Sequence, residues 1–480
     1  MTDSTPSWSW PNTVNIRLAL SQLAEKEPDP VSWERIGGVS ARFGEGRELS
    51  RTLSVRASEL IAGGSQHSLA LGSPFPIQFQ RAKGPYIWDV DGNRYVDFVQ
   101  AGGASLLGSA PASIGRHVAS AIERFGPSIA LGHPEEIELA SAIHEQFPSI
   151  ERFRMLGSGT EAVMAAIRVA RAFTGAANVV KHSGAYHGWS DQVVLGLNAP
   201  GPGERRIRGV PEATLSFTSE VASNDTSALE QLLEFNETRG GTAAVIVEPL
   251  GPQSGGLPVD EPYNAEVARL CRNAGALLIF DEVVTGFRLG TAGVQGHLNM
   301  RPDLTVLGKC LTAGYPTAGG LGGRSDVMGV LSPGNPAFTL VAGTLSANPV
   351  ATAAGCAAIS EMRLTDAARV AALNGELLTE GLAGLISEYD LPFVTYGFGS
   401  VVHIHTTGVS HLRASHENFI EESFSRWRLM NTFAAAALIE GLVVPVSGRL
   451  FVSTTHLPDV ISEVLERFER LFARFAGIDF

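Results

Sequence analysis

Two ionisable side chains at the ends of apolar runs have the types and the spacing to carry out chemistry together. The apolar residues 277–280 lead into Asp281, and residues 304–308 lead into Lys309. If both runs are strands of one parallel sheet, both side chains emerge at its carboxyl edge, where open α/β sheets bind their ligands. A buried aspartate near a buried lysine is also a common structural ion pair. The rest of the sequence therefore has to decide between an ion pair and a functional site.

A glycine-rich turn at residues 157–160 follows a predicted strand over residues 153–156 and precedes a predicted helix over residues 161–174. Glycines allow a sharp turn there, and the free amides at the start of a helix bind phosphate well. The turn also fits the dinucleotide pattern G-x-G-x-x-A, which requires an acidic residue about 20 positions later to bind a ribose. The next predicted strand ends instead in Lys181 and His182. This difference favours a phosphate site and argues against a nicotinamide-dependent dehydrogenase.

Further motifs allow more than one interpretation. Tyr186 follows a predicted strand and could stack on a flat heteroaromatic ring or cover the core. His187 has no second histidine or carboxylate at metal-ligand spacing, so we expect a hydrogen-bonded turn histidine and no metal site. The loop over residues 343–349 could bind an anion or form a plain turn. The strand that ends in Asp281 fits the magnesium-binding strand of a P-loop ATPase, but the sequence contains no G-x-x-x-x-G-K-[ST] motif.

Composition and charge restrict the class of protein. The chain has 480 residues, of which 44% are hydrophobic and 53 are glycine, as expected for a globular enzyme of more than one domain. A net charge of -13 argues against nucleic acid and anionic membrane surfaces as partners. The cysteines, Cys271, Cys310 and Cys356, are too few and too scattered for a disulfide framework or a metal cage. No secretory signal and no apolar stretch long enough to span a bilayer is readable, so we expect a cytoplasmic protein.

The order of the predicted elements indicates an α/β fold. A hairpin with an Asp-Gly-Asn turn is predicted over residues 86–98, and strands alternate with helices over residues 153–309, which is typical of a parallel sheet with helices on both faces. The elements predicted after residue 365 are a helix over 366–389, a strand over 400–405, a helix over 417–440, a strand over 450–455 and a helix from 459 to the end. We therefore predict a large domain over residues 116–365 with a mostly parallel sheet, and a smaller α+β domain over residues 366–480. Residues 1–115 are predicted to form an N-terminal arm, with one helix near residues 16–26, and a hairpin segment that joins the small domain.

A phosphate-binding turn, a stacking tyrosine, an aspartate and a lysine together meet the requirements of a pyridoxal 5'-phosphate site. The ring nitrogen of this cofactor must stay protonated for the ring to accept electrons, and a buried carboxylate such as Asp281 holds that proton. The aldehyde of the cofactor forms a Schiff base with a lysine, for which Lys309 is the candidate. We therefore predict that the protein binds pyridoxal 5'-phosphate.

The motifs give the sequence a resemblance to a known family. From about residue 58 to the carboxyl end it resembles the class III aminotransferases, which belong to the fold type I pyridoxal-phosphate enzymes. The matching motifs lie at residues 82–84, 91–95, 157–162, 186–188, 247–249, 280–288, 307–309 and 343–346. Within the family the sequence is most similar to the glutamate-1-semialdehyde aminomutases and the β-phenylalanine aminotransferases.

The resemblance implies roles around the cofactor ring. Lys309 would bind the cofactor covalently, and Asp281 would pair with its ring nitrogen. Tyr186 and Val283 would lie on the two faces of the ring. Glu248 would be an acid near the ring.

The resemblance also implies how the phosphate is held and how subunits assemble. Ser158, Gly159 and Thr160 would bind the phosphate of their own subunit's cofactor. Thr344 would reach the phosphate of the neighbouring subunit, because family members are homodimers with the site at the interface. The N-terminal arm would then pack on the partner.

Departures from the family patterns bear on the substrate. Aminomutases carry an arginine for the substrate carboxylate in the segment over residues 65–70, and this chain has none there. In the β-phenylalanine group the arginine position reads His67 in this chain, and the aminomutase glutamate near the carboxyl end is replaced by residues 447–449. Arg449 is in a position where similar β-amino acid aminotransferases bind a carboxylate. We therefore predict that Arg449 is the carboxylate anchor and that His67 is the second substrate-binding residue.

These observations predict an aminotransferase that moves an amino group between a primary amine or a non-α (β-type) amino acid and a keto acid. The alternative within the family is an aminomutase of the glutamate-1-semialdehyde type, which retains its product instead of exchanging it. A non-enzymatic protein with the same fold is a further alternative. Retention of both Asp281 and Lys309 argues against it.

Overall fold

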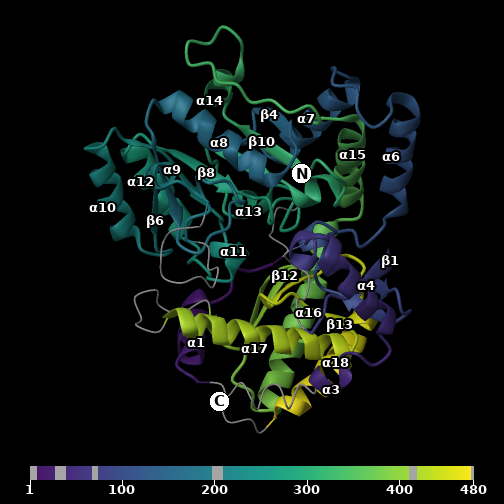
Figure 1. Cartoon of the computed structure of the whole chain (residues 1–480). Helices are drawn as coiled ribbons and strands as arrows, with labels where there is room; N and C mark the ends of the chain where they lie inside the picture. The colour runs from purple at the N-terminus through teal and green to yellow at the C-terminus, as the bar shows by residue number, and fades with distance from the viewer. Residues whose placement is uncertain (1–7, 28–38, 68–73, 197–208, 410–418, 477–480) are drawn as a thin grey trace. The chain divides into compact units, whose positions relative to one another are not determined.

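The computed structural model describes residues 8–27, 39–67, 74–196, 209–409 and 419–476. These residues form two units (Figure 1). The large unit comprises the described residues of segment 112–368, and the small unit comprises those of segments 8–111 and 369–476.

A seven-stranded sheet forms the centre of the large unit. In spatial order its strands are β4 (Arg152–Leu156), β10 (Gly319–Gly323), β9 (Leu304–Leu307), β8 (Leu277–Asp281), β7 (Thr242–Val247), β5 (Asn178–His182) and β6 (Thr218–Val221). Neighbouring strands are parallel except at β10, which is antiparallel to both β4 and β9. The predicted α/β fold with a mostly parallel sheet is therefore confirmed.

The two apolar runs that lead to Asp281 and Lys309 are neighbouring parallel strands, as predicted. Asp281, the last residue of β8, lies opposite Val306 of β9. Strand β9 ends at Leu307, earlier than predicted, and the 3₁₀ turn η2 (Lys309–Thr312) follows. Lys309 has a positive φ of 44°, so the chain leaves the strand direction before it reaches the lysine.

Helices cover this sheet because its central strands are apolar on both faces. Every residue of β5, β7, β8 and β9 is buried, which is typical of a parallel sheet between helical layers. Helix α8 (Gly159–Thr174) packs on β7, β9 and β10 through buried alanines, and it ends at Gly175 in the left-handed conformation, as predicted. Helix α12 (Tyr263–Asn273) packs on β8, and α10 (Thr226–Glu237) packs on β7.

The remaining helices of the large unit are mostly short. Helices α6 (Ala112–Phe125) and α7 (Pro134–Gln146) both pack on α15 (Pro349–Leu364). The short elements are α9 (Glu212–Leu215), α11 (Pro252–Gly255), α13 (Gly293–His297), α14 (Ser325–Met328) and η3 (Gly329–Leu331).

The small unit contains two antiparallel-rich sheets. The first has the order β1 (Phe79–Lys83), β2 (Tyr86–Asp89), β3 (Arg94–Asp97) and β13 (Leu442–Val443), and the second has the order β11 (Val394–Phe398), β12 (Val401–His405) and β14 (Arg449–Phe451). The predicted hairpin is β2–β3, and its turn contains Gly92 with a φ of 92°. Strand β13 pairs in parallel with β3, so this sheet joins segments from both ends of the chain.

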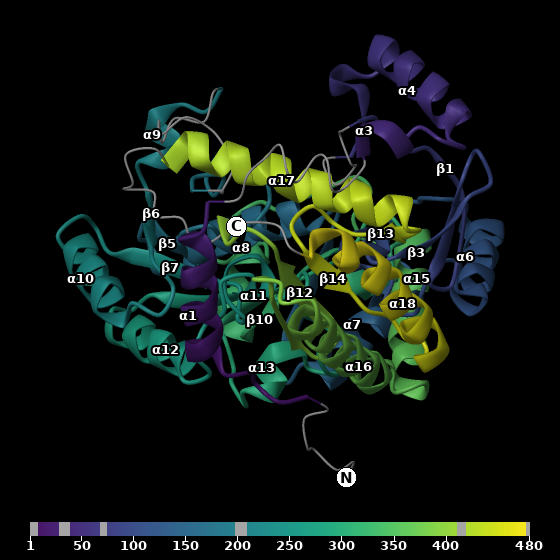
Figure 2. The same cartoon turned by 90° about the horizontal axis from the view of Figure 1, so that it is seen from below.

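The small unit contains several long helices, of which α16 (Ala367–Glu388), α17 (Phe419–Ile439) and α18 (Pro458–Phe475) contribute to its apolar core. The others are α1 (Thr13–Ala24) and α4 (Glu48–Leu60), with the short elements α3 (Val39–Arg42), α5 (Gln100–Gly103) and η1 (Ala62–Gly64). Figure 2 shows α16, α17 and α18 together. Their core contains Phe433, Phe468, Phe472 and Phe475, all almost fully buried. The α+β character predicted for the C-terminal part is present in this unit.

Two predicted elements of the small unit have other bounds. The strand predicted over residues 450–455 ends at Phe451, because Ser453 and His456 form a hydrogen-bonded turn. The helix predicted near residues 16–26 begins earlier, at Thr13, because the Asn12 side chain accepts a hydrogen bond from the first turn.

Neither a bilayer-spanning helix nor a metal-binding cluster is found in the described part of the chain. Its helices are too short or too polar to cross a membrane. No group of three or more histidine, cysteine or acidic residues is arranged there to hold a metal ion.

Candidate functional site

Asp281 is the last residue of β8, and Lys309 follows the end of the neighbouring strand β9. Both residues therefore lie at the same edge of the sheet. Asp281 is 6% exposed. Its Oδ2 accepts a hydrogen bond from Nδ1 of His187 at 2.7 Å, and its Oδ1 accepts one from the backbone N–H of Val283 at 3.1 Å. Among the described residues Asp281 forms no ion pair with Lys309. The charge of Asp281 is therefore held by a histidine and an amide, and the simple structural ion pair is not formed.

His187 is a site residue that the sequence identified only in part. The prediction of a hydrogen-bonded turn histidine is confirmed, but its partner Asp281 was not predicted. His187 lies in the turn after β5, and Asp281 ends β8, which is two strands away in the sheet. The order of the strands in the sequence does not predict that His187 and Asp281 are neighbours, because β7 lies between β5 and β8 in the sheet.

Glu248 fixes the backbone of the turn that carries Tyr186. Its buried carboxylate accepts hydrogen bonds from the N–H groups of Tyr186 at 3.1 Å, Gln253 at 2.7 Å and Ser254 at 2.5 Å. Gln253 and Ser254 both have positive φ values, so this carboxylate also stabilises an unfavourable turn. The structure therefore brings Glu248 to Tyr186 through the main chain.

The Tyr186 side chain lies beside Asp281 and remains accessible. It is 49% exposed. Partial burial and the negative charge of Asp281 both raise the pKa of the phenol. Gly188, which has a φ of 88°, lies against the first turn of α8, because a Cβ at Gly188 would meet Oγ1 of Thr160 at 2.5 Å. This close contact fixes the turn against the glycine-rich segment.

The glycine-rich segment is the N-terminus of α8, as predicted. Ser158 is its N-cap, and its Oγ accepts from the N–H of Glu161 at 3.2 Å. The Glu161 side chain accepts in turn from the N–H of Gly157 at 2.9 Å. This reciprocal capping leaves the N–H groups of Gly159 and Thr160 directed out of the helix end, where an anion is stabilised.

Val283 lies between the start of α8 and the turn that carries Lys309. A Cβ at Gly159 or at Gly308 would lie 3.0 Å from the Val283 side chain. The two glycines therefore allow Val283 to contact both segments at once. Ser158, Gly159, Thr160, Val283 and Lys309 are all partly exposed, so this region can be reached by a ligand.

Two charged residues that follow Asp281 in the sequence, Glu282 and Arg288, are buried and bind other parts of the protein. Glu282 is fully buried, accepts hydrogen bonds from Thr285 and from the N–H groups of Val294 and Gln295, and has its pKa raised by burial. Arg288 is also fully buried, and burial lowers its pKa. It forms a hydrogen bond with Cys310, the residue after Lys309, and so connects the segment after β8 to the turn after β9.

The other predicted site residues are Thr344 of the large unit and His67 and Arg449 of the small unit. Thr344 lies on an exposed turn of the large unit, and its hydroxyl has no hydrogen-bond partner among the described residues. His67 and Arg449 belong to the small unit. His67 is exposed, whereas Arg449 is half-buried, lies opposite His403 in the β12–β14 pairing and has its guanidinium 5.2 Å from the Phe451 ring centre.

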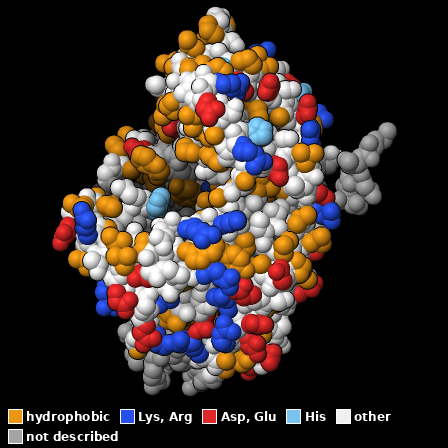
Figure 3. All heavy atoms as spheres, turned by 90° about the vertical axis from the view of Figure 1, so that its right-hand side faces the viewer, with side chains coloured by type: hydrophobic (Ala, Val, Ile, Leu, Met, Phe, Trp, Pro, Cys, Tyr) orange, Lys and Arg blue, Asp and Glu red, His pale blue; other side chains and the backbone are white. Residues whose placement is uncertain are grey.

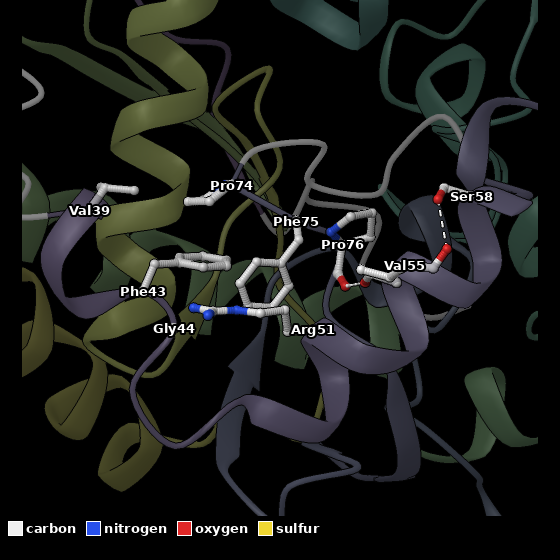
Figure 4. Close-up of a pocket in the computed structure, with 10 residues that line it drawn as sticks. Val39, Phe43, Gly44, Arg51, Val55, Ser58, Pro74, Phe75 and Pro76 are labelled. Carbon is white, nitrogen blue, oxygen red and sulfur yellow. Dashed lines mark hydrogen bonds between the residues drawn. The ribbon is translucent and has the colours of Figure 1, made fainter.

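A separate pocket of about 480 Å³ lies in the small unit, and Figure 4 shows its lining. The rings of Phe43 and Phe75 lie at its centre, and the Arg51 guanidinium lies 5.3 Å from the Phe75 ring centre. The Ser54 and Ser58 hydroxyls donate to backbone oxygens. None of the residues predicted to carry chemistry lines this pocket.

The chain is similar to a known protein family and to proteins of known structure. The family described as aminotransferase class-III matches residues 69–471. A glutamate-1-semialdehyde 2,1-aminomutase from Anaeromyxobacter sp. (strain K) is 36% identical over 440 residues, which are 90% of this chain and 99% of that protein. A β-phenylalanine aminotransferase structure from Variovorax paradoxus is 28% identical with a TM-score of 0.79, covering 91% of this chain and 96% of that chain. A transaminase structure with PLP bound is 27% identical with a TM-score of 0.80, covering 90% of this chain and 99% of that chain.

Proposed function

The chain belongs to the class III aminotransferases, which are pyridoxal 5'-phosphate enzymes, and we propose that it transfers an amino group between a primary amine or a non-α (β-type) amino acid and a keto acid. The observation that carries this proposal is the position of Asp281 and Lys309 at the ends of neighbouring strands, with Asp281 bound to His187. In this arrangement His187 holds Asp281 at the carboxyl edge of the sheet, beside the turn that carries Lys309.

The residues of the large unit fit pyridoxal 5'-phosphate. Because a Cβ at Gly159 or Gly308 would crowd the Val283 side chain, these glycines let the backbone of the phosphate turn and of the Lys309 turn approach Val283 closely. The exposed face of Tyr186 and the N-terminus of α8 suit a flat ring and a phosphate. When bound, the cofactor supplies an electron-accepting ring that stabilises negative charge at the substrate carbon.

Each residue then has a distinct task. Asp281 would keep the ring nitrogen protonated, and His187 would hold Asp281 in place. Lys309 Nζ would bind the cofactor aldehyde and, once the substrate amine has displaced it, would move a proton at the substrate carbon.

The remaining cofactor contacts follow the predicted assignments. Ser158, Gly159 and Thr160 would donate hydrogen bonds to the phosphate. Tyr186 and Val283 would contact the two ring faces. Glu248 would act indirectly, by fixing the backbone of Tyr186.

A homodimer with shared sites is part of this proposal. Large apolar side chains of the large unit are exposed in a single copy, among them Leu131, Ile137 and Trp189, each 74% exposed. Figure 3, which faces the side of α6 and α15, shows apolar side chains gathered on its upper part. A second copy would bury such residues, and Thr344 would then reach the neighbouring cofactor. The few and scattered cysteines support a cytoplasmic location.

An aminomutase of the glutamate-1-semialdehyde type is the second candidate, because a relative 36% identical to this chain has that name. Two features argue against it. The arginine of the aminomutase pattern is absent from residues 65–70, and the glutamate of that pattern is absent from residues 447–449.

Incubating the holoenzyme with amines and β-amino acids in the absence of an acceptor tests the choice. We expect the cofactor absorbance to change to that of pyridoxamine phosphate, and a keto acid to restore it. Acceptor-free isomerisation of glutamate 1-semialdehyde, without conversion by any amine, would contradict the proposal.

A further inference from the structure

Two buried histidine nitrogens near the carboxyl edge of the large sheet have no hydrogen-bond partner among the described residues. They are Nδ1 of His182, the last residue of β5, and Nε2 of His187. Both side chains are almost fully buried. Because an unpartnered polar atom in a protein interior is costly, such atoms are usually satisfied by ordered water.

The other nitrogen of each ring is already bound. Nδ1 of His187 lies 2.7 Å from Oδ2 of Asp281, and Nε2 of His182 lies 2.9 Å from the phenol oxygen of Tyr263, the first residue of α12. His187 contributes to lowering the pKa of His182, so the two rings are close enough to interact electrostatically. The two nitrogens without a partner, Nδ1 of His182 and Nε2 of His187, are therefore both buried on rings whose other nitrogen is already hydrogen-bonded.

We propose that one water molecule bridges Nδ1 of His182 and Nε2 of His187. Tyr263, His182, the water, His187 and Asp281 then form one continuous hydrogen-bond relay. His182 and Tyr263 are positioning residues in this relay, since they act on Asp281 through His187. The proposal rests on the proposed function of Asp281 as the partner of the cofactor ring nitrogen.

The protonation of His182 gives the relay a direction. Burial, His187 and the neighbouring Lys181 together lower the pKa of His182 to about 3, so its ring is neutral at ordinary pH and carries one N–H. The phenol oxygen of Tyr263 faces the backbone amide of Asn224, which favours its O–H donating to Nε2 of His182. The N–H of His182 is then at Nδ1 and donates to the water.

The remaining bonds follow the same direction. The water donates to Nε2 of His187, and Nδ1–H of His187 donates to Asp281. Because every donor points towards Asp281, each hydrogen bond polarises the next and strengthens it. The relay thereby holds the carboxylate with its negative charge directed to the sheet edge.

A crystal structure of the holoenzyme at a resolution that reveals waters tests the bridge directly. We expect a water within hydrogen-bond distance of Nδ1 of His182 and Nε2 of His187. Direct contact between the two rings, or an apolar gap between them, would overturn the proposal.

Variants test the relay in solution. Tyr263→Phe removes only the terminal hydroxyl, and Tyr396→Phe is a matched control, because Tyr396 is equally buried at 4% exposure and its phenol lies 3.1 Å from Nε2 of His405 in the small unit. The readout is the downfield proton signal of His187 Nδ1–H, identified by its loss in His187→Asn. We expect an upfield shift in Tyr263→Phe and no shift in Tyr396→Phe.

Activity gives a second readout. Loss of one neutral hydrogen bond corresponds to a fall in kcat of about 2- to 10-fold, with little change in KM. His182→Phe should give a similar loss, and His182→Gln, whose amide can both accept and donate, should restore most of it. An unchanged proton signal in both Tyr263→Phe and His182→Phe would refute the relay. If the signal shifts but the wild-type enzyme transfers no amino group, the relay stands and the proposed function fails.

Discussion

Asp281 is a buried carboxylate whose two oxygens each accept one fixed hydrogen bond. The donors are an imidazole N–H from His187 and a backbone N–H from Val283, and neither needs to reorganise when a ligand binds. Fixed donors of this kind maintain charge where a reaction requires it. At the residue scale, the arrangement favours a carboxylate that acts on a ligand over one that stabilises the fold.

Removing the charge of Asp281 tests this interpretation. Asp281→Asn should lower the turnover of amino-group transfer by roughly 10²-fold or more, because a preorganised charge partner is lost. Asp303→Asn is the matched control: Asp303 lies near the opposite end of the same two strands, where it accepts from the N–H of Leu278 and pairs with Arg324. Steady-state kinetics of both variants provide the measurement. Near-normal turnover in Asp281→Asn would return Asp281 to a structural role.

The Arg449 side chain tests the proposed carboxylate anchor. Arg449→Ala should strongly raise KM for a keto acid acceptor, because losing a bidentate charged contact costs about 1.5 to 3 kcal/mol. The KM for a simple amine donor should change much less. Arg81→Ala is the control, since Arg81 is an exposed arginine of the same unit that also stacks on an aromatic ring, that of Trp88. Small and equal effects on both half-reactions would show that Arg449 is not the anchor.

At the element scale, the strands and helices that position the site could be predicted because their patterns are local. The apolar run before Asp281, the glycine-rich turn and the Gly175 helix end each follow from a few adjacent residues. The early end of β9 and the positive φ of Lys309 could not be predicted, because the local sequence contains no signal that breaks the strand before Lys309. The pairing of His187 with Asp281 depends on strand order in space, and no local pattern contains it.

Helix α1 shows how one buried side chain can fix a terminal element. Arg426 of α17 is almost fully buried and donates to the backbone oxygens of Ala24, at the end of α1, and of Lys26, as well as to that of Thr407. A cation at a helix C-terminus also interacts favourably with the helix dipole. Arg426 therefore connects α1 to two other segments of the small unit.

Substituting Arg426 should release α1. Arg426→Ala should destabilise its attachment by about 1 to 3 kcal/mol, because buried carbonyl groups lose their donors. Hydrogen exchange of the α1 amides should accelerate accordingly. Arg428→Ala, at an exposed position of the same helix, is the control and should leave exchange in α1 unchanged. Equal exchange rates in the two variants would show that α1 is held by other contacts.

At the scale of the whole molecule, the proposed sharing of sites between two copies depends on Thr344. Thr344 is exposed and has no hydrogen-bond partner in the part of the chain that the structure describes, and its turn begins a few residues after Leu340, which is 65% exposed. Arg168 of α8 holds this segment by donating to the backbone oxygen of Leu340 at 2.8 Å. The turn is therefore attached to the same helix whose N-terminus would bind phosphate, and its exposed side chains remain available to a second copy.

Mixing inactive subunits tests whether Thr344 acts across the interface. Thr344→Asp would place a negative charge against the phosphate of the neighbouring cofactor, and Lys309→Ala would remove the covalent attachment in its own site. If each site combines Lys309 of one copy with Thr344 of the other, a heterodimer of the two variants contains one site free of both changes. We expect the mixture to regain activity, whereas each variant alone stays largely inactive. A chain carrying both substitutions, mixed with Lys309→Ala, is the control and should regain none. If mass spectrometry shows subunit exchange in the test mixture but no activity returns, Thr344 either serves its own subunit or lies outside the site.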